Sequence, residues 1–315
     1  MSLLRENFSR KFTATGEVSP PPCPDKTLFA REVEEMKPLM GRILGVNVVE
    51  GPGGRVLMSS LGASIYMIQH GVEPILQQVV RDKNRVALQN DLISASIFEI
   101  ENVLSIAGDH PACPASDNPK SKPVYDMDST TLIVMLKKLN EGKLWNGKDT
   151  NYENKNLNAK TNFFIGTGLS PTSSPLDGEI YKVKRKLIAG CDFFQTQGVF
   201  DIEPIINFLN LYEKTIGEKI SDKILVGIVP IWSYGMMKYL LTLPGIVIGE
   251  KFRNDVNEAR KKQKETGQKG LIEEIGVNLC VDLVDKIKGL GVKGVHIMPV
   301  GNLHAMKEIL DKSGL

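Results

Sequence analysis

Short apolar and β-branched runs alternate along the chain with longer amphipathic runs. An apolar run of about four to eight residues is typical of a buried strand, whereas apolar residues spaced three and four apart are typical of a helix with one buried face. The strand pattern occurs in eight segments: residues 12–18, 45–50, 74–80, 102–108, 162–168, 191–199, 223–229 and 294–300. The pattern therefore predicts eight strands separated by helices.

The helix-like segments complete a regular alternation. They cover residues 24–40, 60–71, 85–101, 128–142, 176–190, 202–217 and 234–245, then a pair at 250–266 and 270–291, and finally 303–314. Strands that alternate with helices predict a parallel sheet, and right-handed crossovers at this count close most naturally into a (β/α)₈ TIM barrel. A doubly wound open sheet is the alternative, but no G-x-G-x-x-G follows the first strand. We expect an α/β fold with one barrel domain over residues 1–315 and an extra helical segment between strands seven and eight.

Composition narrows the class of protein. The 315 residues are 42% hydrophobic and 24% charged, and the net charge of +2 leaves no excess field to attract nucleic acid or an anionic membrane. The N-terminal MSLLRENFSRKF has no continuous apolar core, and no apolar run reaches the roughly 18 residues that a membrane span needs. We therefore expect a soluble cytoplasmic protein with neither a nucleic-acid nor a membrane partner.

The cysteines and histidines do not form a metal-binding pattern. The cysteines are widely separated and make no C-x-x-C, which predicts reduced thiols and neither a zinc site nor a disulfide framework. The histidines show no H-x-x-H or H-E-x-x-H spacing, so we predict no metal. These residues are Cys23, Cys113, Cys191, Cys280, His70, His110, His296 and His304.

Polar residues end six of the predicted strands. In a parallel barrel these ends meet at one mouth, where chemistry is placed. A single polar strand end is explained by an ordinary hydrogen-bonded loop, but the convergence of six predicts a pocket for a polar ligand, with two carboxylates available for proton transfer. The residues are Glu17, Glu50, Gln77 with Gln78, Asp109, Thr167, and Gln195 with Gln197.

Consecutive prolines follow the first of these carboxylates, in the stretch EVSPPPCPD. Proline fixes φ and forces the preceding residue to be extended, so Pro20–Pro22 predict a rigid loop that leaves Glu17 aimed into the mouth. The alternative is a stiff entry into the helix that starts near Asp25. A basic run, Val183–Lys186, precedes the sixth strand and is read either as a contact for a cofactor phosphate or as a solvent-facing stripe.

Three of these segments together resemble one family. EVSPP resembles the E-x-x-PP signature of methylenetetrahydrofolate reductases, NVLSIAGD their L-x-GD segment, and FFQTQGVFD their F-x-TQ-x-x-FD segment. The stretches VNVVEGPGGRVLMSS, EPILQQVVRDKNRVALQNDL and VYDMDS also match, so the resemblance runs from about residue 12 to about residue 300. The fold of that family is the (β/α)₈ barrel already expected.

The resemblance implies a flavin-dependent reduction of 5,10-methylenetetrahydrofolate to 5-methyltetrahydrofolate. It implies that Glu17 is the general acid, that Asp109 lies between flavin and pterin, and that Gln197, with Gln195 beside it, contacts the folate. The implied cofactor is FAD or FMN, reduced by a pyridine nucleotide or by a protein electron donor. The implied flavin contacts are Gln77, Gly108, Asp109, Glu179, Arg185 and Lys186.

The chain departs from the family pattern at several of these contacts. Gln77 stands where many members have histidine, and Val49, Ala107, Met236 and Asn302 stand near customary threonine, arginine, glutamine and arginine. Two other functions therefore stay open: a barrel that transfers the methyl group of methyltetrahydrofolate without redox chemistry, and a non-redox folate-binding subunit of a complex. The electron donor, the choice between folate and a related pterin, and assembly as a homo-oligomer or with a redox subunit also stay open.

Overall fold

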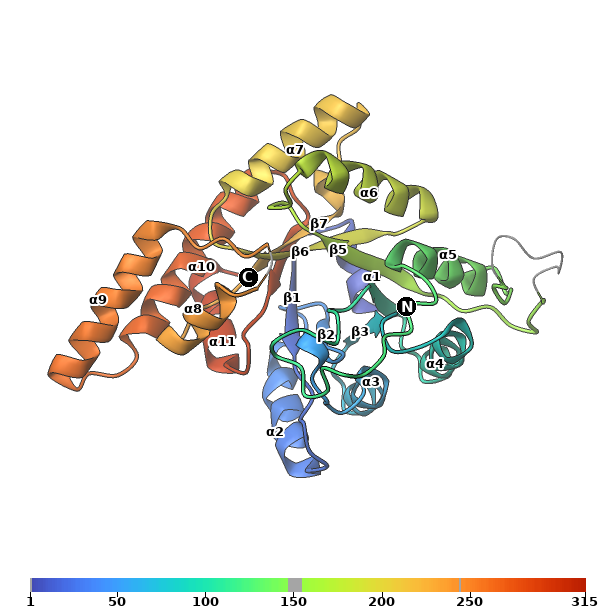
Figure 1. Cartoon of the computed structure of the whole chain (residues 1–315), viewed down its shortest axis with the longest axis horizontal. Coiled ribbons are helices and arrows are strands. Elements are labelled where there is room, and N and C mark those ends of the chain that lie inside the picture. The colour runs from blue at the N-terminus through green and yellow to red at the C-terminus, as the bar shows by residue number, and fades with distance from the viewer. Residues whose placement is uncertain (1, 147–154, 244) are drawn as a thin grey trace.

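The computed structural model of the chain describes residues 2–146, 155–243 and 245–315. Eight parallel strands close into a barrel in chain order, which confirms the predicted (β/α)₈ fold (Figure 1). Each strand begins within two residues of its predicted start, whereas several end earlier than predicted. The strands are β1 (Thr13–Val18), β2 (Val46–Val48), β3 (Pro74–Val79), β4 (Asn102–Ile106), β5 (Phe164–Leu169), β6 (Phe193–Val199), β7 (Ile224–Ile228) and β8 (Gly294–Ile297).

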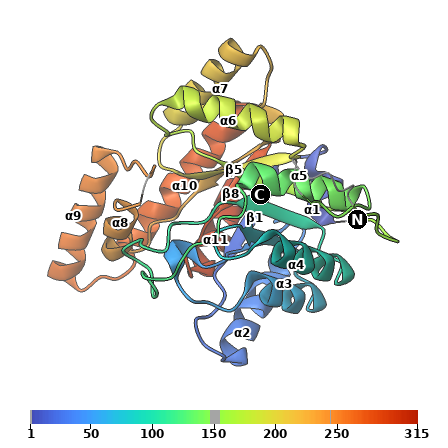
Figure 2. The same ribbon diagram turned by 45° about the vertical axis from the view of Figure 1, so that its right-hand side comes forward.

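Helices surround the barrel on its outer side (Figures 1 and 2). Side chains cap several helix starts: Asp25, Asn84 and Asp128 each accept a backbone N–H of the first turn. The helices are α1 (Leu3–Phe8), α2 (Lys26–Met36), α3 (Ser60–Gln69), α4 (Arg85–Ile97), α5 (Ser129–Asn140), α6 (Leu176–Ala189), α7 (Glu203–Ile216), α8 (Tyr234–Leu240), α9 (Glu250–Thr266), α10 (Leu271–Gly289) and α11 (Leu303–Ser313), with short 3₁₀ turns at Lys37–Leu39, Pro52–Gly54 and Ser221–Lys223.

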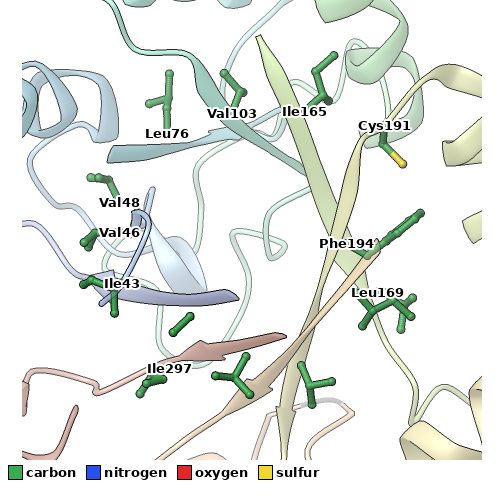
Figure 3. Packing of buried hydrophobic residues seen from close by; sticks show 14 of the residues in the cluster. Ile43, Val46, Val48, Leu76, Val103, Ile165, Leu169, Cys191, Phe194 and Ile297 are labelled. Atoms are coloured by element: carbon green, nitrogen blue, oxygen red, sulfur yellow. The ribbon is translucent and has the colours of Figure 1, made fainter. Parts of the chain in front are cut away.

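The main core lies between the barrel wall and the helices. Alternate residues of the strands point outward into it, for example Val46 and Val48 of β2 and Val103 of β4 (Figure 3). The complementary residues point into the barrel, so Asn47 and Gln77 face its interior. This alternation determines which polar side chains reach the mouth.

The N-terminal helix α1 closes the barrel at the starts of the strands. Leu4 and Phe8, four residues apart on one helix face, pack with Phe164, Phe193 and other apolar residues at the strand starts. The rings of Phe8 and Phe164 have centroids 5.3 Å apart. We did not predict this helix, whose six residues are too few for a periodic pattern to be recognised. Its packing leaves the opposite end of the barrel as the open one.

The expected extra helical segment lies between β7 and β8. It consists of α8, α9 and α10, which are labelled in Figure 2. These helices share a second core that includes Met237, Phe252, Val256 and Ile272. Among the residues that the structure describes, no helix combines the length and the apolar character needed to cross a bilayer.

Candidate active site

A cavity of about 430 Å³ opens at the mouth, where the strands end. Residues from seven strands or the loops directly after them line it, since β7 alone among the eight contributes none. Of the six predicted polar strand ends, those of β1, β3 and β6 reach it, through Glu17, Gln77, Gln195 and Gln197. The polar lining residues are Glu17, Asn47, Gln77, Ser105, Ser129, Ser170, Glu179, Lys182, Lys186, Gln195, Thr196, Gln197 and His296.

Glu17 lies in the cavity beside a buried histidine. Its Oε2 is 3.5 Å from Nε2 of His296, whose side chain is 3% exposed, compared with 19% for that of Glu17. The other ring nitrogen of His296, Nδ1, is 2.9 Å from Oγ1 of Thr15. A carboxyl group that reaches the cavity and has one buried polar neighbour is placed to exchange a proton with a ligand.

Asn47 and Gln195 form an amide pair across the barrel interior. Nδ2 of Asn47 donates to Oε1 of Gln195 at 2.6 Å, and Nε2 of Gln195 donates to Oδ1 of Asn47 at 3.2 Å. Nδ2 of Asn47 also lies 3.3 Å from Nε2 of His296. Both amides are nearly fully buried, so this pair fixes the polar floor of the cavity.

An irregularity in β6 separates its two glutamines. The pairing of β6 with β7 shifts register between Gln195 and Gly198, and Oγ1 of Thr196 accepts the backbone N–H of Gly227. Gln195 consequently stays deep in the barrel, whereas Gln197 lies at the exposed rim, where its Oε1 accepts a hydrogen bond from Ser170. Both line the cavity, as their two-residue spacing predicts.

One face of α6 supplies the charged wall. Glu179, Lys182 and Lys186 are three and four residues apart, so they share that face. Nζ of Lys186 donates to the carbonyl of Gly168 at 2.7 Å, and burial, with Lys182 nearby, lowers the pKa of Lys186 to about 8. Glu179 pairs with Lys182 through one oxygen and accepts the N–H of Ser170 with the other. Lys186 therefore keeps two donors for an anionic ligand.

Arg185 lies on a different face of the same helix. Its guanidinium is 3.4 Å from the carboxylate of Asp128, on the outside between α5 and α6, and it does not line the cavity. Of the three cations in the run Val183–Lys186, Lys186 lines the cavity, whereas Lys184 and Arg185 pair with acids outside it.

The loop after β4 carries Asp109 away from the cavity lining. Its carboxylate accepts the N–H of Gly53 at 2.7 Å, and its carbonyl accepts a hydrogen bond from the buried Arg81. The turn depends on Gly108, where φ is +84° and a Cβ would lie 2.4 Å from a methyl carbon of Val79. In this structure Asp109 joins the loop after β4 to the turn after β2, while Ala107 lines the cavity.

Seven polar lining residues were not predicted: Asn47, Lys182, His296, Ser105, Ser129, Ser170 and Thr196. Asn47 is the one polar residue in an otherwise apolar run, and Lys182 completes the helical spacing of Glu179 and Lys186. We considered His296 only for metal spacing, although strand alternation places it on the inward face of β8. The predicted mouth residues Glu50, Gln78 and Thr167 do not line the cavity. Glu50 pairs with Lys83, and the Thr167 hydroxyl donates to the carbonyl of Ser105.

Comparison with known proteins identifies the family. The family model described as methylenetetrahydrofolate reductase matches residues 3–314. The chain belongs to this family. It is 24% identical over 321 residues to methylenetetrahydrofolate reductase 1 of Schizosaccharomyces pombe, which covers 99% of this chain and 48% of the relative. It is also 24% identical over 150 residues to 5,10-methylenetetrahydrofolate reductase of Buchnera aphidicola, covering 47% of each.

The chain spans about half the length, or less, of these curated relatives of the methylenetetrahydrofolate reductase family. Among solved structures, it is similar in fold to a protein from Clostridium thermocellum described as uncharacterized and as binding two copies of 5-methyl-5,6,7,8-tetrahydrofolic acid. The TM-score is 0.63 at 14% identity, with 99% of this chain and 98% of the other covered. This likeness supports the barrel fold of the family.

The cavity has several features that fit the flavin implied by the family resemblance. Its wall along β4 and β5 combines small residues, Ser105, Ala107 and Gly168, with the aliphatic residues Leu104, Ile106 and Leu169. A Cβ added at Gly168 would meet nothing within 4 Å. A flat ring system fits against such a wall. The Gln77 side chain lines the same space and makes no hydrogen bond to a described residue, while Lys186 has donors to spare. The wall, Gln77 and Lys186 thus fit a flavin, whereas Arg185 and the Asp109 carboxylate have other partners.

Proposed function

We propose that the mouth cavity binds a reduced folate and that the chain interconverts 5,10-methylenetetrahydrofolate and 5-methyltetrahydrofolate in a flavin-dependent reaction. The observation that carries this proposal is the position of Glu17. Its carboxyl group lines the cavity and lies next to the buried His296, beside the hydrogen-bonded pair of Asn47 and Gln195. Membership of the methylenetetrahydrofolate reductase family supports it. The folate named for the Clostridium thermocellum neighbour supports the class of ligand.

The proposed chemistry needs one proton and one hydride. In the reducing direction, the Glu17 carboxyl donates its proton to the bridging nitrogen of the folate, the five-membered ring opens, and the methylene carbon becomes an electrophilic iminium carbon. Reduced flavin, when bound, supplies the hydride that this carbon accepts. The proton and the hydride together account for the methyl product.

The remaining cavity residues bind and orient the ligands. Gln195 and Gln197 offer amide groups to the polar edge of the pterin, and the small wall at Ala107 and Gly168 leaves room for stacked rings. Lys186 would hold an anionic group of the cofactor, and Gln77 the edge of its ring. FAD or FMN both satisfy these contacts, and a reduced pyridine nucleotide or a protein donor would return the electrons.

A second candidate function is folate binding without redox chemistry, as a methyltransferase or as a subunit of a complex. The observation that favours it is the loss of two implied flavin contacts, since Arg185 pairs with Asp128 and the Asp109 carboxylate binds the Gly53 backbone. In this case the folate cavity would be intact and the flavin contacts incomplete.

Two measurements on the purified chain separate these functions. Calorimetric titration with 5-methyltetrahydrofolate is expected to show saturable one-to-one binding, whichever of the two functions the chain has. If the chain does not bind this folate, both functions are refuted. After incubation with FAD or FMN, the proposed reductase is expected to have the visible absorption of bound flavin and to oxidise 5-methyltetrahydrofolate with an artificial electron acceptor. A colourless chain that binds the folate but never reduces the acceptor would favour the second function.

A further inference from the structure

We propose that Ser170 is a positioning residue that determines ligand specificity: its hydroxyl group holds the side-chain amide of Gln197 in one of two orientations, so that the cavity rim presents N–H donors to the ligand and not a carbonyl oxygen. The inference rests on the proposed function, in which Gln197 contacts the folate. It adds the requirement that the ligand turns a hydrogen-bond acceptor towards β6.

The register of β5 with β6 brings the two side chains together. Gly168 and Gln195 are paired residues on these strands, and Ser170 and Gln197 each follow one of them by two positions. Residues two apart along a strand face the same side, so both side chains emerge next to each other at the mouth. The Ser170 hydroxyl oxygen lies 3.0 Å from Oε1 of Gln197, and both residues line the cavity.

The backbone of Ser170 is held on both sides, which fixes the place of its hydroxyl group. Its N–H donates to Oε1 of Glu179 at 2.9 Å, and the Glu179 side chain is only 2% exposed and pairs with Lys182. Its carbonyl accepts the N–H of Ser173 at 3.2 Å, so the chain turns back directly after the strand. The hydroxyl group is therefore presented from an anchored turn.

The two ends of the Gln197 amide have different surroundings. Oε1 accepts the Ser170 hydroxyl and lies against Gly245, where an added Cβ would collide with this oxygen. Thr172 holds Gly245 in place, because its hydroxyl donates to the Gly245 carbonyl at 2.5 Å. Nε2, in contrast, makes no hydrogen bond within the part of the chain that the structure describes. Its N–H groups are therefore left for a ligand in the cavity.

The reverse orientation of the amide would satisfy fewer groups. It would turn an N–H towards Gly245, whose carbonyl already accepts the Thr172 hydroxyl, and would leave the amide oxygen facing the cavity. In the orientation of the structure, the oxygen accepts from Ser170 and lies against the Cα of Gly245, where a weak C–H···O contact is favourable. The Ser170 contact thus has a partner in keeping the oxygen at the wall.

A fixed donor selects one edge of the ligand. Asn47 and Gln195 use their amides on each other, so Gln197 is the cavity amide with its N–H groups available. A reduced pterin accepts hydrogen bonds at its unprotonated ring nitrogen and its carbonyl oxygen, whereas its ring N–H groups donate. A pterin that turned an N–H edge towards Gln197 would leave donors facing donors, at the cost of an unmade hydrogen bond.

The amide orientation is tested without any ligand. A neutron crystal structure of the deuterated chain locates the deuterons of the Ser170 hydroxyl and of the Gln197 amide. We expect the hydroxyl deuteron to point at Oε1 and the deuterons of Nε2 to face the cavity. A deuteron of Nε2 that points at the Ser170 hydroxyl oxygen would overturn the proposal.

In solution, two substitutions of Ser170 test the positioning role. Ser170→Ala removes the hydroxyl group, and we expect the Kd for 5-methyltetrahydrofolate, measured by calorimetry, to rise about three- to tenfold. Ser170→Thr keeps a hydroxyl group and should bind within about twofold of wild type. Ser173→Ala, in the same turn but outside the cavity lining, is the matched control and should leave Kd unchanged.

Substitutions of Gln197 separate positioning from a direct contact of Ser170 with the ligand. If Ser170 acts through Gln197, adding Ser170→Ala to Gln197→Ala should change Kd less than about 1.5-fold. Gln197→Glu replaces the N–H donors with a carboxylate oxygen of similar shape. We expect it to raise Kd at pH 8 at least about 30-fold, because two acceptors would then face each other.

The outcomes distinguish this inference from the proposed function. A wild-type Kd in Ser170→Ala, equal losses in Ser170→Ala and Ser170→Thr, or a full Ser170→Ala loss in the Gln197→Ala background would overturn the positioning role and leave the proposed function standing. Binding by Gln197→Glu within about threefold of wild type would do the same. If the wild-type chain binds no folate, the proposed function fails, and the neutron structure still decides which end of the amide faces the cavity.

Discussion

Thr15 and His296 are register partners on neighbouring strands, and a 2.9 Å contact joins their side chains through the Nδ1 of the histidine. Because Glu17 follows Thr15 by two residues, its carboxyl group comes out beside the other nitrogen of the same ring. Pairing of β1 with β8 thus places Glu17, whereas Pro21 and Pro22 line a separate apolar hollow together with Phe29. The proline loop therefore lies beside β1 without contacting the cavity, and the pairing of β1 with β8 determines where the Glu17 carboxyl group lies.

The closure of the barrel by α1 predicts a large cost for truncating Phe8. The ring packs against Phe164 and Phe193 at centroid distances of 5.3 and 5.5 Å, so Phe8→Ala should leave a cavity and lower the free energy of unfolding by about 3 kcal/mol. Urea denaturation measures this loss. Leu3→Ala, on the exposed side of the same helix, should cost less than about 0.5 kcal/mol. Equal losses for the two variants would show that α1 does not pack as described.

Glu73, just before β3, predicts a pH-dependent stability. Burial raises its pKa from 4.5 to about 7, although a hydrogen bond from Asn102 opposes the shift. Between these two values the folded state binds more protons than the unfolded state, so the Glu73 contribution to stability falls as the pH rises through this window. Glu73→Gln keeps the oxygen that accepts from Asn102 and removes the titration.

We therefore expect Glu73→Gln to stabilise the chain by on the order of 1–2 kcal/mol at pH 8 and by almost nothing at pH 4.5. Thermal or urea unfolding of both proteins at the two pH values measures the difference. Glu265→Gln, at an exposed position of α9, is the control and should not reproduce this difference between the two pH values. A Glu73→Gln gain that is equal at both pH values would contradict the assignment.

Lys186 predicts how the binding of an anionic cofactor depends on pH. Because burial lowers its pKa to about 8, the ammonium loses its charge as the pH rises above that value. The affinity for FMN, measured by quenching of flavin fluorescence, should fall between pH 7 and about 9.5. In Lys186→Gln the affinity should be weaker at pH 7 and nearly independent of pH. Lys184→Gln, which removes an outward-facing cation of α6 that pairs with Glu218, should keep the wild-type profile.

The sequence predicted the barrel well because each strand is a compact apolar run between clear helix signals. All eight strands were placed, as were the helices from α2 onward. Helix α1 was missed because its stability comes from Leu4 and Phe8 packing against strands far away in sequence, which a local pattern does not reveal. The early ends of β4 and β8 depend on turns, such as the one at Gly108, that only the folded backbone shows.

The site was predicted less completely than the fold. Glu17, Gln77, Glu179, Lys186, Gln195 and Gln197 all line the cavity, as their strand-end or helix positions suggest. Arg185 does not, because adjacent helix residues are about 100° apart and cannot share the face of Lys186. The position of Asp109 was not predictable, since the partner that holds its carboxylate, Gly53, belongs to another loop.

The most direct test of the account is the Glu17→Gln substitution. With flavin reconstituted, the folate half-reaction with 5-methyltetrahydrofolate is followed by stopped-flow absorbance, and folate affinity is measured in parallel by calorimetry. We predict a Kd within about threefold of wild type and a half-reaction slowed by at least about 10²-fold, since the amide fills the same space but cannot act as a general acid or base. A half-reaction that proceeds at the wild-type rate in Glu17→Gln would contradict the central claim that this carboxyl group carries the proton.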